Sequence, residues 1–325
     1  MASSSSFYQQ VAANRRNSFL LAVAVTAVLA ALGFSVGYAL SGDPAGGIGA
    51  TALAGGAGLA MSIGSYFAGD KLVLGVSGAA PVDEASAPQL MNVVREMSLA
   101  ANIPMPRVYV INDSAPNAFA TGRDPRHASI AVTTGLLQKL DREELQGVIG
   151  HELSHVRNFD IRFTLVVGVL VGAIALLADF FLRSLWWGGG RRSSRDRDGG
   201  GLQALFLVVA LILAVLAPIV ARFIQLAVSR QREYLADVSA VEITRNPYGL
   251  QRALAKIATD REALEAANRA TAHLYFTNPV KPWEDRAKEF LSTHPPIVER
   301  INRLRQLTGE PPLHPSEVGA LAGLD

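Results

Sequence analysis

Residues 151–155 read His-Glu-Leu-Ser-His, and this stretch decides how the rest of the chain is interpreted. On a helix, His151 and His155 lie four residues apart and project from one face, so both imidazoles can reach a single metal ion. Glu152 lies beside the first imidazole without being forced to coordinate, which is the position of a general base acting on metal-activated water. Such a five-residue string also arises by chance, so the hypothesis depends on the surrounding sequence.

The residues before this motif have the pattern of a helix that carries it. Leu145, Val148 and Ile149 have the spacing of one apolar helix face. Asp141, with Glu144 three residues later, has the pattern of an N-cap with a capping box. We therefore expect a helix to begin just after Asp141 and to continue through the motif.

The third ligand of such a site must come from elsewhere in the chain. A catalytic zinc ion takes three protein ligands and keeps its fourth position for water. A metzincin-type continuation would place glycine at 158 and histidine at 161, but the chain has Asn158 and Ile161. Cysteine is absent from the whole sequence, which excludes disulfides, thiolate ligands and a cysteine nucleophile. Histidine and carboxylate side chains remain as the good zinc ligands.

Residues 229–237, Ser-Arg-Gln-Arg-Glu-Tyr-Leu-Ala-Asp, are the best source of that ligand. On the helix that we expect here, Glu233 and Asp237 share a face at four-residue spacing. Glu233 can coordinate the ion, while Asp237 can hydrogen-bond the outer nitrogen of a ligating histidine and fix its orientation. Spacing alone leaves a second interpretation open, in which both carboxylates lie on a solvated helix face beside Arg230 and Arg232.

The composition indicates a protein that lies partly in lipid. Half of the 325 residues are hydrophobic and only 18% are charged. The formal net charge is +2, because 30 Lys and Arg residues nearly balance 28 Asp and Glu residues. This balance gives no electrostatic surface for a nucleic acid, and we expect no nucleic-acid partner.

Four apolar segments are long enough to cross a hydrocarbon core of about 30 Å as helices. They comprise residues 18–40, 45–68, 163–182 and 202–221. A cleaved signal peptide is the alternative for the first segment, but its apolar run is longer than the roughly 7 to 15 residues typical of such peptides. The second segment carries Ala54, Gly58 and Ser62 on one face, where a neighbouring helix can approach closely. A glycine-rich linker is the alternative for this segment.

The segments predict both the domain organisation and the orientation. The five parts are an N-terminal tail (1–17), two transmembrane helices (18–69), a first part of the metal-binding domain (70–161), a transmembrane hairpin with an Arg-rich loop (162–222) and a second part of the domain (223–325). Seven basic residues flank the segments on the side of the termini, against five on the other side. The positive-inside rule therefore places the termini and the metal motif in the cytoplasm.

The region before the metal motif predicts a small soluble layer. Residues 83–101 have the apolar spacing of an amphipathic helix that ends before an Asn-Ile-Pro turn. Three β-like runs follow at 107–112, 117–121 and 128–133, separated by turn residues. We expect a small antiparallel sheet from these runs, within a membrane protein that is mainly α-helical.

Four motifs taken together resemble the HtpX-type membrane zinc metalloproteases, which share a peptidase family with the CAAX prenyl endopeptidases. The motifs are HELSH at 151–155, EYLAD at 233–237, NAFATG at 117–122 and STHPP at 292–296. The resemblance extends from Arg15 to about Leu307. It implies four transmembrane helices, a zincin-like α+β domain and one Zn²⁺ per chain. By this resemblance, His151, His155 and Glu233 bind the ion, Glu152 is the catalytic base and Asp237 supports a ligand.

The resemblance also implies how a substrate is held. The strand of Asn117, Ala118, Phe119 and Ala120 looks like the edge to which an extended peptide backbone pairs. His294 matches a family position near the active site, where it would stabilise the oxyanion of the tetrahedral intermediate.

The function implied is zinc-dependent hydrolysis of peptide bonds in unfolded, damaged or misfolded membrane proteins, in the lipid bilayer of a bacterial-type inner membrane with the catalytic domain in the cytoplasm. One alternative is a prenyl-protein endopeptidase of the CAAX type, although such enzymes have more membrane helices than the four segments seen here. Another is a non-catalytic membrane scaffold or chaperone, which an intact Glu152 argues against because scaffolding requires no base.

Overall fold

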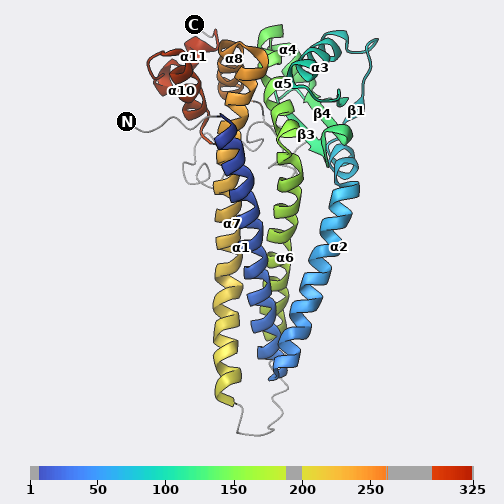
Figure 1. Cartoon of the computed structure of the whole chain (residues 1–325), viewed down its shortest axis with the longest axis vertical. Coiled ribbons are helices and arrows are strands. Elements are labelled where there is room, and N and C mark those ends of the chain that lie inside the picture. Colours follow the sequence, from blue (N-terminus) through green and yellow to red (C-terminus); the bar gives the residue numbers. More distant parts are fainter. Residues whose placement is uncertain (1–6, 188–199, 261, 263–294, 324–325) are drawn as a thin grey trace. The chain divides into compact units, whose positions relative to one another are not determined.

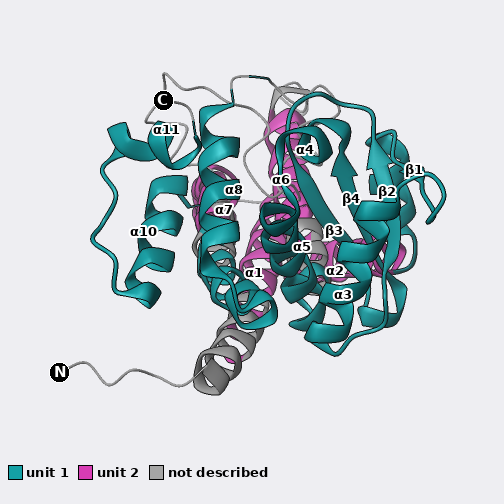
Figure 2. Cartoon of the chain, turned by 90° about the horizontal axis from the view of Figure 1, so that it is seen from above, with its two compact units in different colours: residues 1–14, 67–163, 226–325 teal, residues 15–66, 164–225 magenta. Residues whose placement is uncertain are grey.

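A computed structural model describes residues 7–187, 200–260, 262 and 295–323. The chain forms two compact units, each made of segments that are distant in sequence (Figure 2). Unit 1 comprises residues 1–14, 67–163 and 226–325, and unit 2 comprises residues 15–66 and 164–225.

Unit 2 consists of parts of four long helices (Figure 1). These helices are α1 (Phe7–Ser41), α2 (Pro44–Val76), α6 (Asp160–Trp187) and α7 (Gly200–Thr244). The core of unit 2 contains branched side chains of α1, Phe181 of α6 and a row of alanines on α7. The row is Ala210, Ala214, Ala217 and Ala221. Its spacing of three and four residues keeps these small side chains on one helix face, which allows the helices to pack closely.

The closest approach of α1 and α2 involves glycines. A Cβ added at Gly37 would lie 2.6 Å from the Ala50 Cβ and 2.9 Å from the Gly47 Cα, so the two backbones touch there. The sequence predicts a close approach at the face of Ala54, Gly58 and Ser62. A Cβ at Gly58 would instead meet Leu29 at an ordinary 3.7 Å. The tight contact therefore lies nearer the turn between the helices.

Two helical segments are by themselves long and apolar enough to cross a membrane, Val23–Ser41 and Gly201–Ala221. The helical stretches Pro44–Met61 and Tyr66–Val76, bent by 61°, make a third if they are counted as one span. All four predicted apolar segments lie in helices, but among the described residues the structure supports two or three spans by length and composition. The chain is therefore a membrane protein by these criteria, and four crossings remain a prediction.

Unit 1 contains a four-stranded mixed sheet, and the prediction of an antiparallel sheet was wrong. The strands are β1 (Ala80–Pro81), β2 (Arg107–Ile111), β3 (Ala118–Gly122) and β4 (Ala128–Thr133), in the spatial order β1-β2-β4-β3. β3 and β4 form an antiparallel hairpin, but β4 lies between β3 and β2 and runs parallel to β2. β4 is buried along its whole length, as expected of an interior strand with a parallel neighbour.

Unit 1 also contains the helices α3 (Pro88–Ala101), α4 (Thr134–Lys139), α5 (Arg142–Arg157), α8 (Pro247–Thr259), α10 (Ile297–Thr308) and α11 (Val318–Leu321), with 3₁₀ turns η1 (Pro125–His127) and η3 (Pro315–Glu317). Among these helices, α3 and α8 pack against α5, the helix that carries the metal motif, while α10 and α11 pack against α8 (Figure 1). The predicted capping box is confirmed, because Asp141 and Glu144 exchange hydrogen bonds at the start of α5. Gly147 brings α5 against α8, since a Cβ there would lie 2.7 Å from the Leu250 nitrogen.

Candidate metal centre

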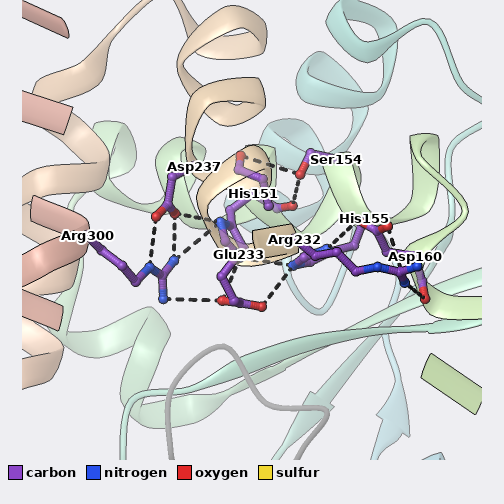
Figure 3. Close-up of polar contacts among 9 residues, drawn as sticks. His151, Ser154, His155, Asp160, Arg232, Glu233, Asp237 and Arg300 are labelled. Atoms are coloured by element: carbon purple, nitrogen blue, oxygen red, sulfur yellow. Dashed lines mark hydrogen bonds and ion pairs between the residues drawn. The ribbon is translucent and has the colours of Figure 1, made fainter. Parts of the chain in front are cut away.

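The structure brings the three predicted metal ligands together. The Nε2 atoms of His151 and His155 lie 3.1 Å apart on α5. Glu233 on α7 places one carboxylate oxygen 3.6 Å from Nε2 of His151 and the other 3.4 Å from Nε2 of His155 (Figure 3). Glu233 and Asp237 are both buried, so the alternative of a solvated helix face is wrong.

The three side chains can each offer one ligand atom to a shared ion, with these atoms within 4.8 Å of one another. With ligand distances of about 2.0–2.2 Å, tetrahedral geometry places neighbouring ligand atoms roughly 3.3–3.6 Å apart. The two Nε2 atoms lie 3.1 Å apart, and each histidine has a Glu233 oxygen at 3.4 or 3.6 Å, a different oxygen for each. Two imidazole nitrogens that both point a lone pair at each other would repel, so either a proton or a shared cation belongs between them.

The charges around the cluster also fit a divalent cation. Among the described residues of this region, four carboxylates and two guanidinium groups are buried. They belong to Glu152, Asp160, Glu233, Asp237, Arg232 and Arg300. When all are ionised, two negative charges remain in excess, and a divalent cation would neutralise them. Because uncompensated buried charge is costly, the donor set and the charge balance agree on a metal site.

His151 is held by a carboxylate on the side away from the cluster. Its Nδ1 lies 2.9 Å from an oxygen of Asp237, which fixes the imidazole with Nε2 directed at the cluster. Burial would raise the pKa of Asp237, but the charge of Arg300 and the contact with His151 outweigh burial and lower that pKa. Asp237 is therefore an ionised acceptor, as the supporting role expected of it requires.

Arg300 on α10 is a member of the site that sequence analysis missed. Its side chain is fully buried and donates two hydrogen bonds to Asp237, at 2.9 and 2.7 Å. It also lies 3.5 Å from a carboxylate oxygen of Glu233 (Figure 3). A signal was present in the sequence, because Arg300 lies on the same helix face as Ile301 and Leu304, which are buried. A charged residue at a core-facing position requires a buried partner.

His155 has a supporting carboxylate of its own, which sequence analysis also missed. Its Nδ1 lies 3.1 Å from Asp160, and Asp160 in turn contacts Arg232 at 3.4 Å. Burial alone would lower the pKa of His155, but the hydrogen bonds with Asp160 and Glu233 raise it to about 10. In the metal-free site His155 thus carries a proton, which an incoming cation must displace.

Glu152 lies between the metal cluster and the sheet. Burial raises the pKa of its carboxyl, while the neighbouring imidazoles and a hydrogen bond from the backbone N–H of Ala120 act in the opposite direction. Ala120 belongs to β3, the last strand in the sheet order. The predicted base and the predicted substrate strand are therefore in direct contact.

The pairing of β3 decides which backbone groups face the site. The backbone carbonyl of Asn117 accepts a hydrogen bond from the N–H of Thr133, so the backbone carbonyl of Asn117 points toward β4. Backbone direction alternates along a strand, and the N–H and C=O groups of Ala118 and Ala120 consequently point away from β4. His294, the predicted oxyanion residue, lies outside the described residues.

A His-His-Glu cluster with a buried glutamate beside it, in a chain with apolar helices long enough for a membrane, is the arrangement of a membrane metallopeptidase. Comparison with known protein families agrees. The model of peptidase family M48 matches residues 84–308, and the chain belongs to this family.

Curated relatives match over three quarters or more of the chain. A protease HtpX homolog of Streptococcus gordonii is 45% identical over 300 residues, which is 92% of this chain and 99% of the relative. A protease HtpX homolog of Caldanaerobacter subterraneus subsp. tengcongensis is 50% identical over 244 residues, or 75% of this chain and 80% of that protein. One from Ligilactobacillus salivarius is 41% identical over 92% of this chain and 99% of its own length. No solved structure matches this chain.

Proposed function

We propose that this metallopeptidase is a zinc endopeptidase in which His151, His155 and Glu233 bind the ion. The observation that carries the proposal is the cluster of His151, His155 and Glu233, which can offer three ligand atoms to one ion beside the buried Glu152. Two imidazoles and a carboxylate are a known catalytic zinc set. The same donor types hold iron in some oxygenases, so measurement of the bound metal is part of the test.

Glu152 has the position of the general base. When bound, the ion would polarise the scissile carbonyl and activate water for attack. Glu152 would accept a proton from that water and pass it to the leaving amine, because its carboxylate lies next to both histidines on α5. The hydrogen bond from the Ala120 N–H keeps this carboxylate beside the sheet.

We propose that Asn117, Ala118, Phe119 and Ala120 bind the substrate as an extended strand. Among the described residues β3 is a terminal strand of the sheet, the backbone groups of Ala118 and Ala120 face away from β4, and the Ala120 N–H donates to Glu152. Pairing through the main chain selects for an extended peptide more than for its side chains. Damaged or misfolded membrane proteins provide such segments, and they fit a peptidase of this zincin-like kind that is itself anchored in the bilayer.

The test of this function is cleavage of an unfolded protein by the detergent-purified chain. We expect casein to be cut, the activity to disappear with a chelator, and stoichiometric Zn²⁺ to restore it. Metal content measured by mass spectrometry before and after chelation would identify the ion. A fully zinc-loaded protein that cuts neither casein nor unfolded membrane segments would favour the scaffold alternative instead.

We also propose four membrane crossings, with both termini in the cytoplasm. Because His155 and Glu233 lie 3.4 Å apart, the chain between them must leave and return on the same side of the membrane. Reporter fusions after residues 140 and 250 should therefore both report the cytoplasm, and a fusion near residue 195 should report the opposite side. Fusions at 140 and 250 on opposite faces would contradict the shared site.

A further inference from the structure

Asp160 joins the two chain segments that carry the metal ligands. Asp160 follows the metal motif in sequence, and one of its carboxylate oxygens lies 3.1 Å from Nδ1 of His155. The other oxygen lies 3.4 Å from a guanidinium nitrogen of Arg232, and the same nitrogen donates a 3.2 Å hydrogen bond to the Asp160 carbonyl. Arg232 immediately precedes the ligand Glu233 on α7. Asp160 therefore contacts one ligand directly and the neighbour of another.

The backbone between α5 and α6 is shaped to bring Asp160 back to His155. α5 ends at Arg157, and Asn158 is its C-cap. Phe159 follows with φ of 60°, a left-handed conformation that is uncommon for a bulky residue. Such a residue persists only where its surroundings hold it, and these conformations cluster at functional sites. At this position it reverses the chain so that the first residue of α6 faces the metal helix.

The contact between Asp160 and Arg232 is buried on both sides. Each side chain is only 6% exposed. Desolvation makes such a pair a poor source of stability, and a buried pair of this kind is better explained by the geometry that it imposes. Asp237 and Arg300 form a buried ion pair beside His151, and Asp160 and Arg232 form a second one beside His155. Figure 3 shows Asp237 and Asp160 on opposite sides of the cluster.

We propose that Asp160 and Arg232 are positioning residues that hold His155 and Glu233 in ligating geometry before the metal arrives. This inference rests on the proposed metal site and deepens it. Asp160 accepts the Nδ1 proton of His155, which leaves Nε2 as the ligand atom. Arg232 fixes Asp160 and, through its own backbone, the turn of α7 from which Glu233 projects.

The test compares zinc affinity in the full chain with Asp160→Asn, Arg232→Gln and the double variant. Competition with a chromophoric chelator should show each single variant binding zinc about 10- to 100-fold more weakly. The zinc affinity of the double variant should be only slightly lower than that of the single variant with the lower affinity, because the two residues act as a unit. The absorption bands of bound Co²⁺ should shift in Asp160→Asn, since the coordination geometry relaxes.

A matched control is Arg252→Gln, which removes an arginine that pairs with the exposed Glu143 elsewhere on α5. Its zinc affinity should equal that of the unmodified chain. Unchanged zinc affinity and unchanged Co²⁺ bands in both Asp160→Asn and Arg232→Gln would overturn the inference, even if their thermal stability falls. Casein cleavage by the unmodified chain is measured in parallel. If the unmodified chain binds zinc but does not cleave casein, the proposed function alone is contradicted. If it cleaves casein but both variants bind zinc as tightly as it does, only the positioning role is contradicted.

Discussion

Glu152→Gln is expected to keep its zinc and to lose nearly all peptide hydrolysis. The amide preserves the size of the side chain and can still accept the hydrogen bond from the Ala120 N–H, so the local packing is retained. It cannot accept a proton at neutral pH, and loss of a general base typically lowers the rate by about 100- to 10,000-fold. Metal content by mass spectrometry and cleavage rates of a peptide substrate, measured on the same preparation, check this result.

Glu143→Gln on the same helix is the matched control. Glu143 is exposed, pairs with Arg252 and has no contact with the cluster, so this variant should cleave at the normal rate. Near-normal turnover by metal-loaded Glu152→Gln would contradict the role assigned to Glu152.

Glu233→Ala is expected to remove stoichiometric zinc and activity together. Glu233 is the ligand from α7, and its loss leaves only the two histidines of α5. Asp237→Asn should instead bind zinc about 10- to 100-fold more weakly and recover activity when zinc is raised, because three ligands remain while the orientation of His151 relaxes. A zinc titration that follows both metal content and cleavage separates the two cases.

The choice of asparagine at 237 follows from the structure. Asp237→Ala would remove the carboxylate that accepts two hydrogen bonds from the fully buried guanidinium of Arg300, and breaking a buried ion pair costs up to about 3–5 kcal/mol of stability. Asparagine keeps an acceptor for both His151 and Arg300. If Glu233→Ala keeps full zinc while Asp237→Asn binds none, the assignment is wrong: Asp237 would be the ligand and Glu233 the supporting residue.

Local sequence pattern predicted the metal helix well. The capping box of Asp141 and Glu144 and the four-residue spacing of His151 and His155 depend only on neighbours within a helical turn. The sheet was predicted less well, because periodicity indicates strands but not which strands pair. Insertion of β4 between β2 and β3 is a non-local choice that no turn signal between consecutive strands encodes.

The supporting residues were missed for a similar reason. Arg300 contacts His151 across 149 positions of sequence, and Arg232 contacts Asp160 across 72. No spacing rule extends over such distances. The alternative of a solvated face beside Arg232 stayed open because the burial of Arg232 cannot be inferred from its neighbours in sequence. Asp160 lies only five residues after His155, but the reversal at Phe159 that brings it back has no glycine to indicate it.

A divalent cation bound among the buried carboxylates of the site would tie the amount of this protein to the supply of metal. A newly made chain without its ion must fold around carboxylates that repel one another, and the proton on His155 offsets only part of that repulsion. Metal binding then contributes directly to the free energy of folding. Starvation for the ion would therefore expose the chain to degradation by other proteases, and cells would lose the molecule itself along with its activity. The same dependence keeps a nascent copy inactive until its site has been filled.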